Sequence, residues 1–134
     1  MFFKEDYGNK IRTMAAIIEI NPKLAVRNEI IDNLSIKVFG HFRNMVTLEM
    51  QGKACRIIAP DVGYTDNLGY ILRFLVDLFD VGDDGNTNIE ELIHTPLRVI
   101  IDTSDFSEKV IAFGHFMKDE FIYIKDLFDL GRKK

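Results

Sequence analysis

Three histidines and one cysteine are the side chains of this 134-residue chain with the widest range of chemistry. His41, His94 and His115 carry imidazoles, which suit zinc. They are far apart in the sequence and form no H-x-H or H-x-x-x-H pair, the spacings that bring two imidazoles to one metal ion. We therefore expect partly buried structural histidines and no bound metal.

Cys55 would be a nucleophile if a histidine base lay beside it. It falls in the apolar run 54–59, and a free cysteine in such a run is usually buried. A single cysteine also excludes an internal disulfide framework and a multi-cysteine zinc site. The chain has no phosphate-binding glycine loop and no G-x-S-x-G motif. The sequence thus favours a non-enzymatic protein without a cofactor over an enzyme with an unrecognised site.

The segment 80–91 has part of the pattern of a calcium-binding EF-hand loop. With Gly85 at loop position 6, oxygen ligands fall at positions 1, 5, 9 and 12 as Asp80, Asp84, Asn88 and Glu91. Position 3 is Gly82, which has no side-chain ligand, and no second loop exists to pair with this one. We expect an acidic connecting loop with no calcium site.

A four-residue echo, F-G-H-F, occurs at 39–42 and again at 113–116. One interpretation is two strands that each end in a glycine bend between packed phenylalanines. The other is that the two histidines face each other across a sheet. We take as a candidate functional patch His41, Arg43, His115, Lys118 and Asp119.

The charge balance argues against general binding of polyanions. Lys and Arg number 17 and Asp and Glu number 21, which gives a formal net charge of -4. Basic residues do occur near the N-terminus, at positions 10, 12, 23 and 27 with Tyr7, and in the tail 132–134. Single-stranded nucleic acid bound through this basic N-terminal region remains the alternative function.

Alternating apolar residues predict three strands between residues 24 and 59. In Leu34–Val38 and in Val46–Met50, apolar residues alternate with polar ones. The third strand, Ala54–Ala59, ends at Pro60. Short turns at Gly40 and Gly52 make this an antiparallel meander. Residues 11–20 fit a helical stripe or a strand, and the β-branched pair Ile17–Ile18 favours a strand.

The segment 67–81 is the strongest helix prediction. Its apolar residues recur at helical spacing, with Leu72 and Leu75 expected in the core. Asp66 or Asn67 can cap its start and Gly82 its end. After it we expect a short helical turn at 89–93 capped by Asn88, strands at 96–102, 109–116 and 121–124, and a final helical turn at 125–130.

These elements predict a single α+β domain over 1–134, with 1–10 and 131–134 loose. It would be an antiparallel sheet of five to six strands with one long apolar helix packed on it. With 47% hydrophobic and 28% charged residues, the composition is that of a folded soluble chain and excludes a disordered one. No apolar run approaches the roughly 20 residues of a membrane span.

The second half of the chain resembles small uncharacterised proteins of phages and prophages. The shared order is an apolar helix, an E-E-L turn, a P-L-R-V strand, and a strand with G-H followed by K-D and an aromatic residue. Here these are 67–81, 90–92, 96–99 and 113–121. Gly40-His41 reverses a His-Gly feature of that group, and a glycine-rich segment after the second strand is missing. The resemblance implies a phage or mobile-element accessory protein and brings no known activity.

We therefore expect a cytoplasmic, non-enzymatic accessory module of a bacterial host. Its partner would be a host or phage protein, or a small ligand that it sequesters. An acidic surface can mask a basic one by complementary charge. Exposed phenylalanines such as Phe2 and Phe3, or an edge strand, would join two copies in a homodimer.

Overall fold

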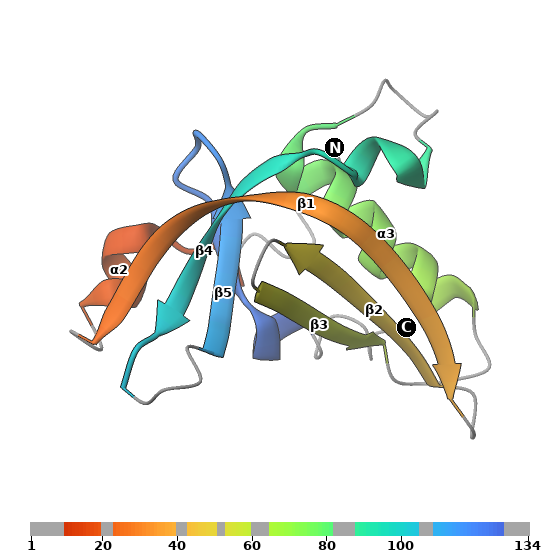
Figure 1. Ribbon diagram of the computed structural model, residues 1–134, viewed down its shortest axis with the longest axis horizontal. Coiled ribbons are helices and arrows are strands. Elements are labelled where there is room, and N and C mark those ends of the chain that lie inside the picture. The colour runs from red at the N-terminus through yellow and green to blue at the C-terminus, as the bar shows by residue number, and fades with distance from the viewer. Residues whose placement is uncertain are drawn as a thin grey trace.

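One long curved strand, β1 (Leu24–Phe39), runs across the whole sheet (Figure 1). Its first half pairs antiparallel with β4 (Pro96–Asp102), and its second half pairs antiparallel with β2 (Arg43–Met50). This computed structural model describes residues 10–19, 23–39, 43–50, 53–59, 65–81, 88–104 and 109–127. The exchange of partner occurs where the register shifts between Ile31 and Asn33.

The sheet is completed by β3 (Lys53–Ala59), β5 (Lys109–His115) and β6 (Phe121–Tyr123). The strand order is β3-β2-β1-β4-β5-β6, and every neighbouring pair is antiparallel. The structure therefore confirms the α+β class with an antiparallel sheet, and the meander predicted for the first three strands.

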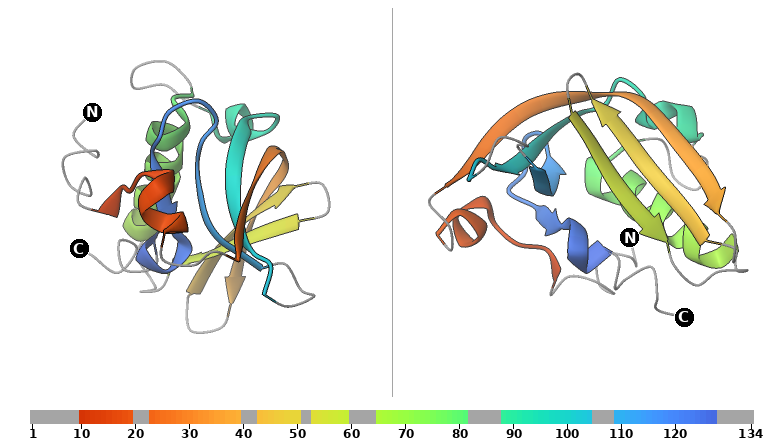
Figure 2. Two further views of the ribbon diagram at one scale, coloured as in Figure 1. Left: turned by 90° about the vertical axis from the view of Figure 1, so that its left-hand side faces the viewer. Right: turned by 60° about the horizontal axis from the view of Figure 1, so that its bottom comes forward.

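Helix α3 (Thr65–Phe79) lies beneath the arch of β1 (Figures 1 and 2). Its buried face inserts into the larger apolar cluster of the protein, with Ile71, Phe74, Leu75, Leu78 and Phe79. The ring centroids of Phe79 and Phe113 lie 5.9 Å apart, so this aromatic contact joins the helix to β5. Leu72, expected in the core, is only half-buried. It follows the fully buried Ile71, and one residue along a helix turns a side chain by about 100° off the buried face.

A second, smaller apolar cluster lies on the opposite face of β4. Ile101 belongs to the larger cluster and Ile100 to the smaller one, because neighbouring residues of a strand point to opposite faces. The smaller cluster is covered by helix α2 (Met14–Ile18), whose Ile17 is fully buried. The sheet is thus packed on both faces at its β4–β6 side.

The strand favoured for residues 11–20 is wrong, because α2 is a helix. Its first turn is held by two side chains that accept hydrogen bonds from backbone N–H groups. Thr13 Oγ1 accepts from the Ala16 N–H at 3.2 Å, and Asp119 Oδ1 accepts from the Met14 N–H at 2.7 Å. Before the helix, Arg12 forms an isolated antiparallel bridge with Phe121 of β6.

The elements after α3 lie close to their predicted positions. A 3₁₀ helix, η3 (Ile89–Leu92), follows Asn88, whose backbone N–H donates to Glu91 Oε2 at 3.0 Å. Strand β4 has the predicted bounds, β5 ends one residue earlier than predicted, and a helical turn over 124–127 follows β6. Within the described ranges, no helix is long and apolar enough to cross a membrane.

Candidate functional site

Part of the predicted patch lies in the turn that joins β5 to β6. His115 ends β5, and Lys118 and Asp119 follow within that turn. The backbone of Arg43 begins β2, which is separated from β5 by β1 and β4 in the sheet. His41 lies outside the described residues, so the predicted facing of the two histidines stays a prediction.

The imidazole of His115 is bonded on both sides within the protein. Nδ1 accepts the backbone N–H groups of Met117 and Lys118, both at 2.9 Å. An Nδ1 that accepts carries no hydrogen, so the proton of the neutral ring is on Nε2. That atom lies 3.3 Å from Asp80 Oδ2. With both nitrogens engaged, this ring holds the turn together and is not placed to take a proton from a substrate.

Arg98 of β4 braces the same turn from its other side. Its Nε donates to the carbonyl of His115 at 3.1 Å, and its Nη2 donates to the carbonyl of Lys118 at 2.9 Å. The guanidinium also lies over the ring of Phe121, 4.9 Å from its centroid. At Gly114 a Cβ would lie 2.6 Å from Phe121 Cδ2 and collide with the carbonyl oxygen of Glu120. These hydrogen bonds and the close packing of Gly114 against Phe121 therefore fix the shape of the turn, although its residues 116–119 are exposed.

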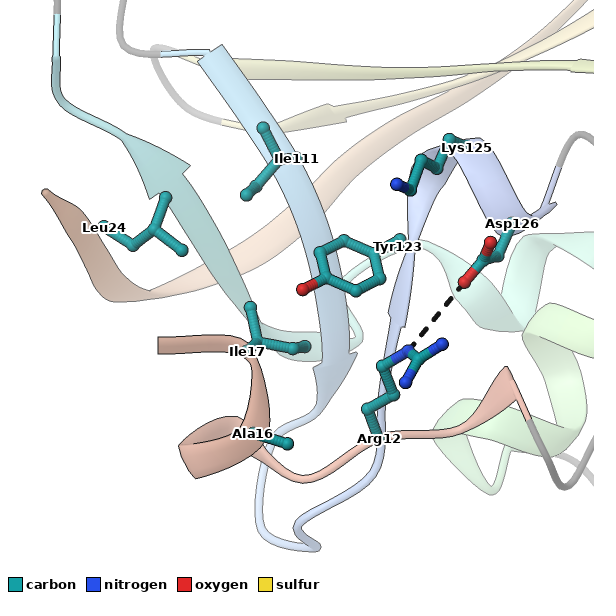
Figure 3. Close-up of a pocket in the computed structure, with 8 residues that line it drawn as sticks. All are labelled: Arg12, Ala16, Ile17, Leu24, Ile111, Tyr123, Lys125 and Asp126. Carbon is teal, nitrogen blue, oxygen red and sulfur yellow. Dashed lines mark ion pairs between the residues drawn. The ribbon is translucent and has the colours of Figure 1, made fainter. Parts of the chain in front are cut away.

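A pocket of about 430 Å³ opens between α2 and β6 (Figure 3). One wall is mainly apolar and the other carries charged groups, with the ring of Tyr123 between them. The lining residues come from the segment before α2, α2 itself, the start of β1, β5, β6 and the turn after β6: Arg12, Ala16, Ile17, Leu24, Ile111, Tyr123, Lys125 and Asp126.

Two cations lie against the aromatic ring in this pocket. Arg12 Cζ is 5.6 Å and Lys125 Nζ is 5.3 Å from the centroid of the Tyr123 ring. The position of Arg12 follows from its backbone, which exchanges two hydrogen bonds with Phe121 at 2.8 and 2.9 Å. Its side chain is 44% exposed, so the guanidinium is available at the mouth of the pocket.

Asp126 places a carboxylate in the same wall. The residue is 8% exposed, and its Oδ2 has no hydrogen-bond partner among the described residues. Arg12 Nε lies 4.0 Å from that oxygen, which is an ion pair but longer than a hydrogen bond. A buried carboxylate with an unfilled hydrogen-bonding position is costly, so this oxygen is suited to a ligand donor.

The other sequence candidates lie elsewhere. Asp80, at position 1 of the EF-hand-like loop, forms ion pairs with His115 and Lys118, and residues 82–87 of that loop lie outside the described ones. Cys55 pairs through its backbone with Leu48 of β2. His94 has a positive φ of 73°, and its N–H donates to the carbonyl of Ile31. Within the part of the chain that is described, no group of three His, Cys, Asp or Glu side chains could hold a metal ion.

Sequence reasoning missed most of the pocket. In the sequence Arg12 is one of several basic residues near the N-terminus, and no motif distinguishes Tyr123, Lys125 or Asp126. The one signal they offer is local, a Y-I-K-D segment that starts at the last residue of the short aromatic strand β6. Nothing in that segment indicates that the chain brings Ile17 and Leu24 next to it.

The chain was compared with protein-family models, curated proteins and solved structures. No family model, curated protein or solved structure matches it.

Proposed function

We propose that the chain is a non-enzymatic binding module that sequesters a small amphipathic ligand in the pocket between α2 and β6. The observation that carries this proposal is the division of the pocket into an apolar wall and a wall with two cations and a buried carboxylate. Small-molecule sites typically combine 300–1,000 Å³ of largely apolar volume with a few convergent polar groups. The pocket, at about 430 Å³, fits that description.

The chemistry around the pocket supports binding over catalysis. The described lining offers no histidine, cysteine or serine, and the one carboxylate, Asp126, lies beside the cation Arg12. His115, which forms an ion pair with Asp80, does not line the pocket, and its imidazole braces the β5–β6 turn. A site of this kind can orient a ligand by charge and by apolar contact.

The proposal is tested by asking what the purified protein carries. Wild type, Ala16→Trp and Ala15→Trp are produced in bacteria and denatured, and the released small molecules are compared by mass spectrometry. Ala16 lines the pocket and Ala15 is its exposed neighbour on α2, so the second variant controls for a tryptophan on this helix. We expect a compound released from wild type and Ala15→Trp and absent from Ala16→Trp. Equal release from all three proteins, or none from wild type, would contradict the proposal.

A second candidate function is binding of single-stranded nucleic acid at the same surface. The observation that favours it is the ring of Tyr123 flanked by Arg12 and Lys125, since bases stack on aromatic rings beside cations. Fluorescence anisotropy of a labelled oligothymidylate, measured at several salt concentrations, separates the two. Binding that weakens steeply with salt and is lost in Arg12→Ala supports this candidate, and no binding at low salt excludes it.

We further propose that two copies form a homodimer through an edge of the sheet. Strand β3 ends the strand order, and edge strands invite pairing with another chain. Light scattering coupled to size exclusion measures the mass. Twice the chain mass is expected, and a mass of one chain that does not change with concentration would contradict the dimer.

A further inference from the structure

Asp126 is the feature of the pocket that points to a particular class of ligand. Its carboxylate is buried, and Oδ2 has no hydrogen-bond partner among the described residues. The best partner for such an oxygen is a cationic N–H group, because charge-assisted hydrogen bonds are about twice as strong as neutral ones. A ligand with an ammonium group would supply it.

The two cations next to Asp126 limit what else the ligand can carry. Arg12 and Lys125 both face the ring of Tyr123, so the charged wall holds two positive groups and one negative group. An amine alone would meet two like charges. A carboxylate alone would pair with the cations but leave Asp126 Oδ2 without a donor and close to a second negative charge. Only a ligand with both groups satisfies all three side chains.

The apolar wall supplies the third part of the ligand. Ile17, Leu24 and Ile111 lie on the other side of the Tyr123 ring from the charged residues (Figure 3). A branched aliphatic or aromatic side chain placed there would leave water and contact these residues. On the proposal that the pocket binds a small ligand, we infer that this ligand is a free α-amino acid with an apolar side chain, bound as a zwitterion.

Asp126 Oδ2 is buried, so a ligand reaches it only after a neighbouring side chain moves, and the neighbour that the proposal moves is Arg12, its ion-pair partner. The Arg12 side chain is 44% exposed, and its ion pair with Asp126 spans 4.0 Å. Swinging the guanidinium outward therefore breaks no short hydrogen bond to this carboxylate. In its new position it would bind the ligand carboxylate, and the ligand ammonium would take its place beside Asp126.

Three probes of the same shape test this inference by isothermal titration of the full chain. L-phenylalanine carries both charged groups, 3-phenylpropionate lacks the ammonium, and 2-phenylethylamine lacks the carboxylate. We expect L-phenylalanine to bind about tenfold or more tightly than either analogue, the size expected when one charge-assisted hydrogen bond is lost. Either analogue binding as tightly as L-phenylalanine would overturn the inference and leave the proposed binding function standing.

A variant assigns the effect to Asp126. Asp126→Asn should weaken the binding of L-phenylalanine about tenfold. The binding of 3-phenylpropionate should be unchanged or tighter, because the negative charge of Asp126 no longer repels its carboxylate. Asp32→Asn, an exposed position on β1, is the matched control and should change neither. Circular dichroism verifies that both variants fold, and the comparison of probes on wild type needs no variant.

If none of the three probes binds wild type, the amino-acid inference is wrong. The proposed function fails as well only if wild type also releases no compound that Ala16→Trp lacks. The two experiments can therefore contradict the amino-acid inference and the proposed function independently.

Discussion

Asp119 Oδ1 accepts a hydrogen bond from the backbone N–H of Met14 at 2.7 Å, which ties the β5–β6 turn to the first turn of α2, 105 positions earlier in the chain. Helix α2 has only five residues, too few to be stable without tertiary contacts. It also supplies Ala16 and Ile17 to the pocket. The braced turn of His115, Lys118 and Asp119 thus holds the helix that covers the proposed ligand site.

Removing the Asp119 carboxylate should loosen α2. We expect Asp119→Ala to lower the free energy of unfolding by about 0.5–2 kcal/mol, the usual cost of losing a side-chain cap. Hydrogen exchange at the Met14 and Ala16 amides should accelerate, while the amides of β4 stay protected. Asp119→Asn keeps an acceptor oxygen and should lose less, so equal exchange in the two variants would argue against this anchor.

A methyl group at Gly114 should disrupt the β5–β6 turn. Its Cβ would lie 2.6 Å from Phe121 Cδ2 and against the carbonyl of Glu120, and the backbone must shift to make room. We expect Gly114→Ala to lose about 1–3 kcal/mol of stability in denaturant unfolding, in the range for overpacked sites. A loss of less than about 0.5 kcal/mol would show that the turn yields easily.

The ion pair of Lys118 with Asp80 predicts a change of stability at high pH. The hydrogen bond from Lys118 Nζ to the Asp80 carboxylate, and the charge of that carboxylate, raise the pKa of Lys118 above its ordinary value of 10.5. A raised pKa means that the contribution to stability is complete below that ordinary value. It is lost as the pH rises through the higher folded-state value.

Lys118→Met removes this contribution and keeps the length of the side chain. Denaturant midpoints of wild type and Lys118→Met should differ at pH 9 and converge at more alkaline pH. Because Lys118 is at the surface, the difference will be small and should shrink with added salt. A gap that stays constant from pH 9 upward would contradict this role of the ammonium group.

Leu75 and Leu72 test the orientation of α3. Leu75 is 0% exposed in the larger apolar cluster, whereas Leu72 is half-buried at its edge. Leu75→Ala should cost about 2–5 kcal/mol in denaturant unfolding, and Leu72→Ala clearly less. Equal losses, or a larger loss at Leu72, would mean that the helix presents a different face to the sheet.

Local patterns predicted most of the strands, but of the 16-residue strand β1 they specified only Leu34–Val38. Pro96 at a strand start and the apolar run after it gave β4 its observed bounds, and alternation gave the β2 and β3 hairpin. They were not enough for α2. Ile17 and Ile18 favour a strand by intrinsic preference, and the contact that decides for a helix comes from Asp119 at the other end of the chain.

The pocket could not be predicted for the same reason. Arg12 and Asp126 stand near opposite ends of the sequence and meet only because β6 pairs with the segment before α2. The F-G-H-F repeat, by contrast, is a short local signal. At the described copy, His115, it marks a turn held by backbone hydrogen bonds.

The most direct test of the ligand pocket is methyl NMR of the full chain during titration with small acids, amines and amino acids that carry an apolar group. The account predicts that the compounds that bind shift the methyl signals of Ile17, Leu24 and Ile111, which line the pocket. Ile30 and Ile36, which are 51% and 37% exposed, should not move and serve as controls. Shifts confined to Ile30 and Ile36, or no shift with any compound at millimolar concentration, would contradict the pocket as the functional site.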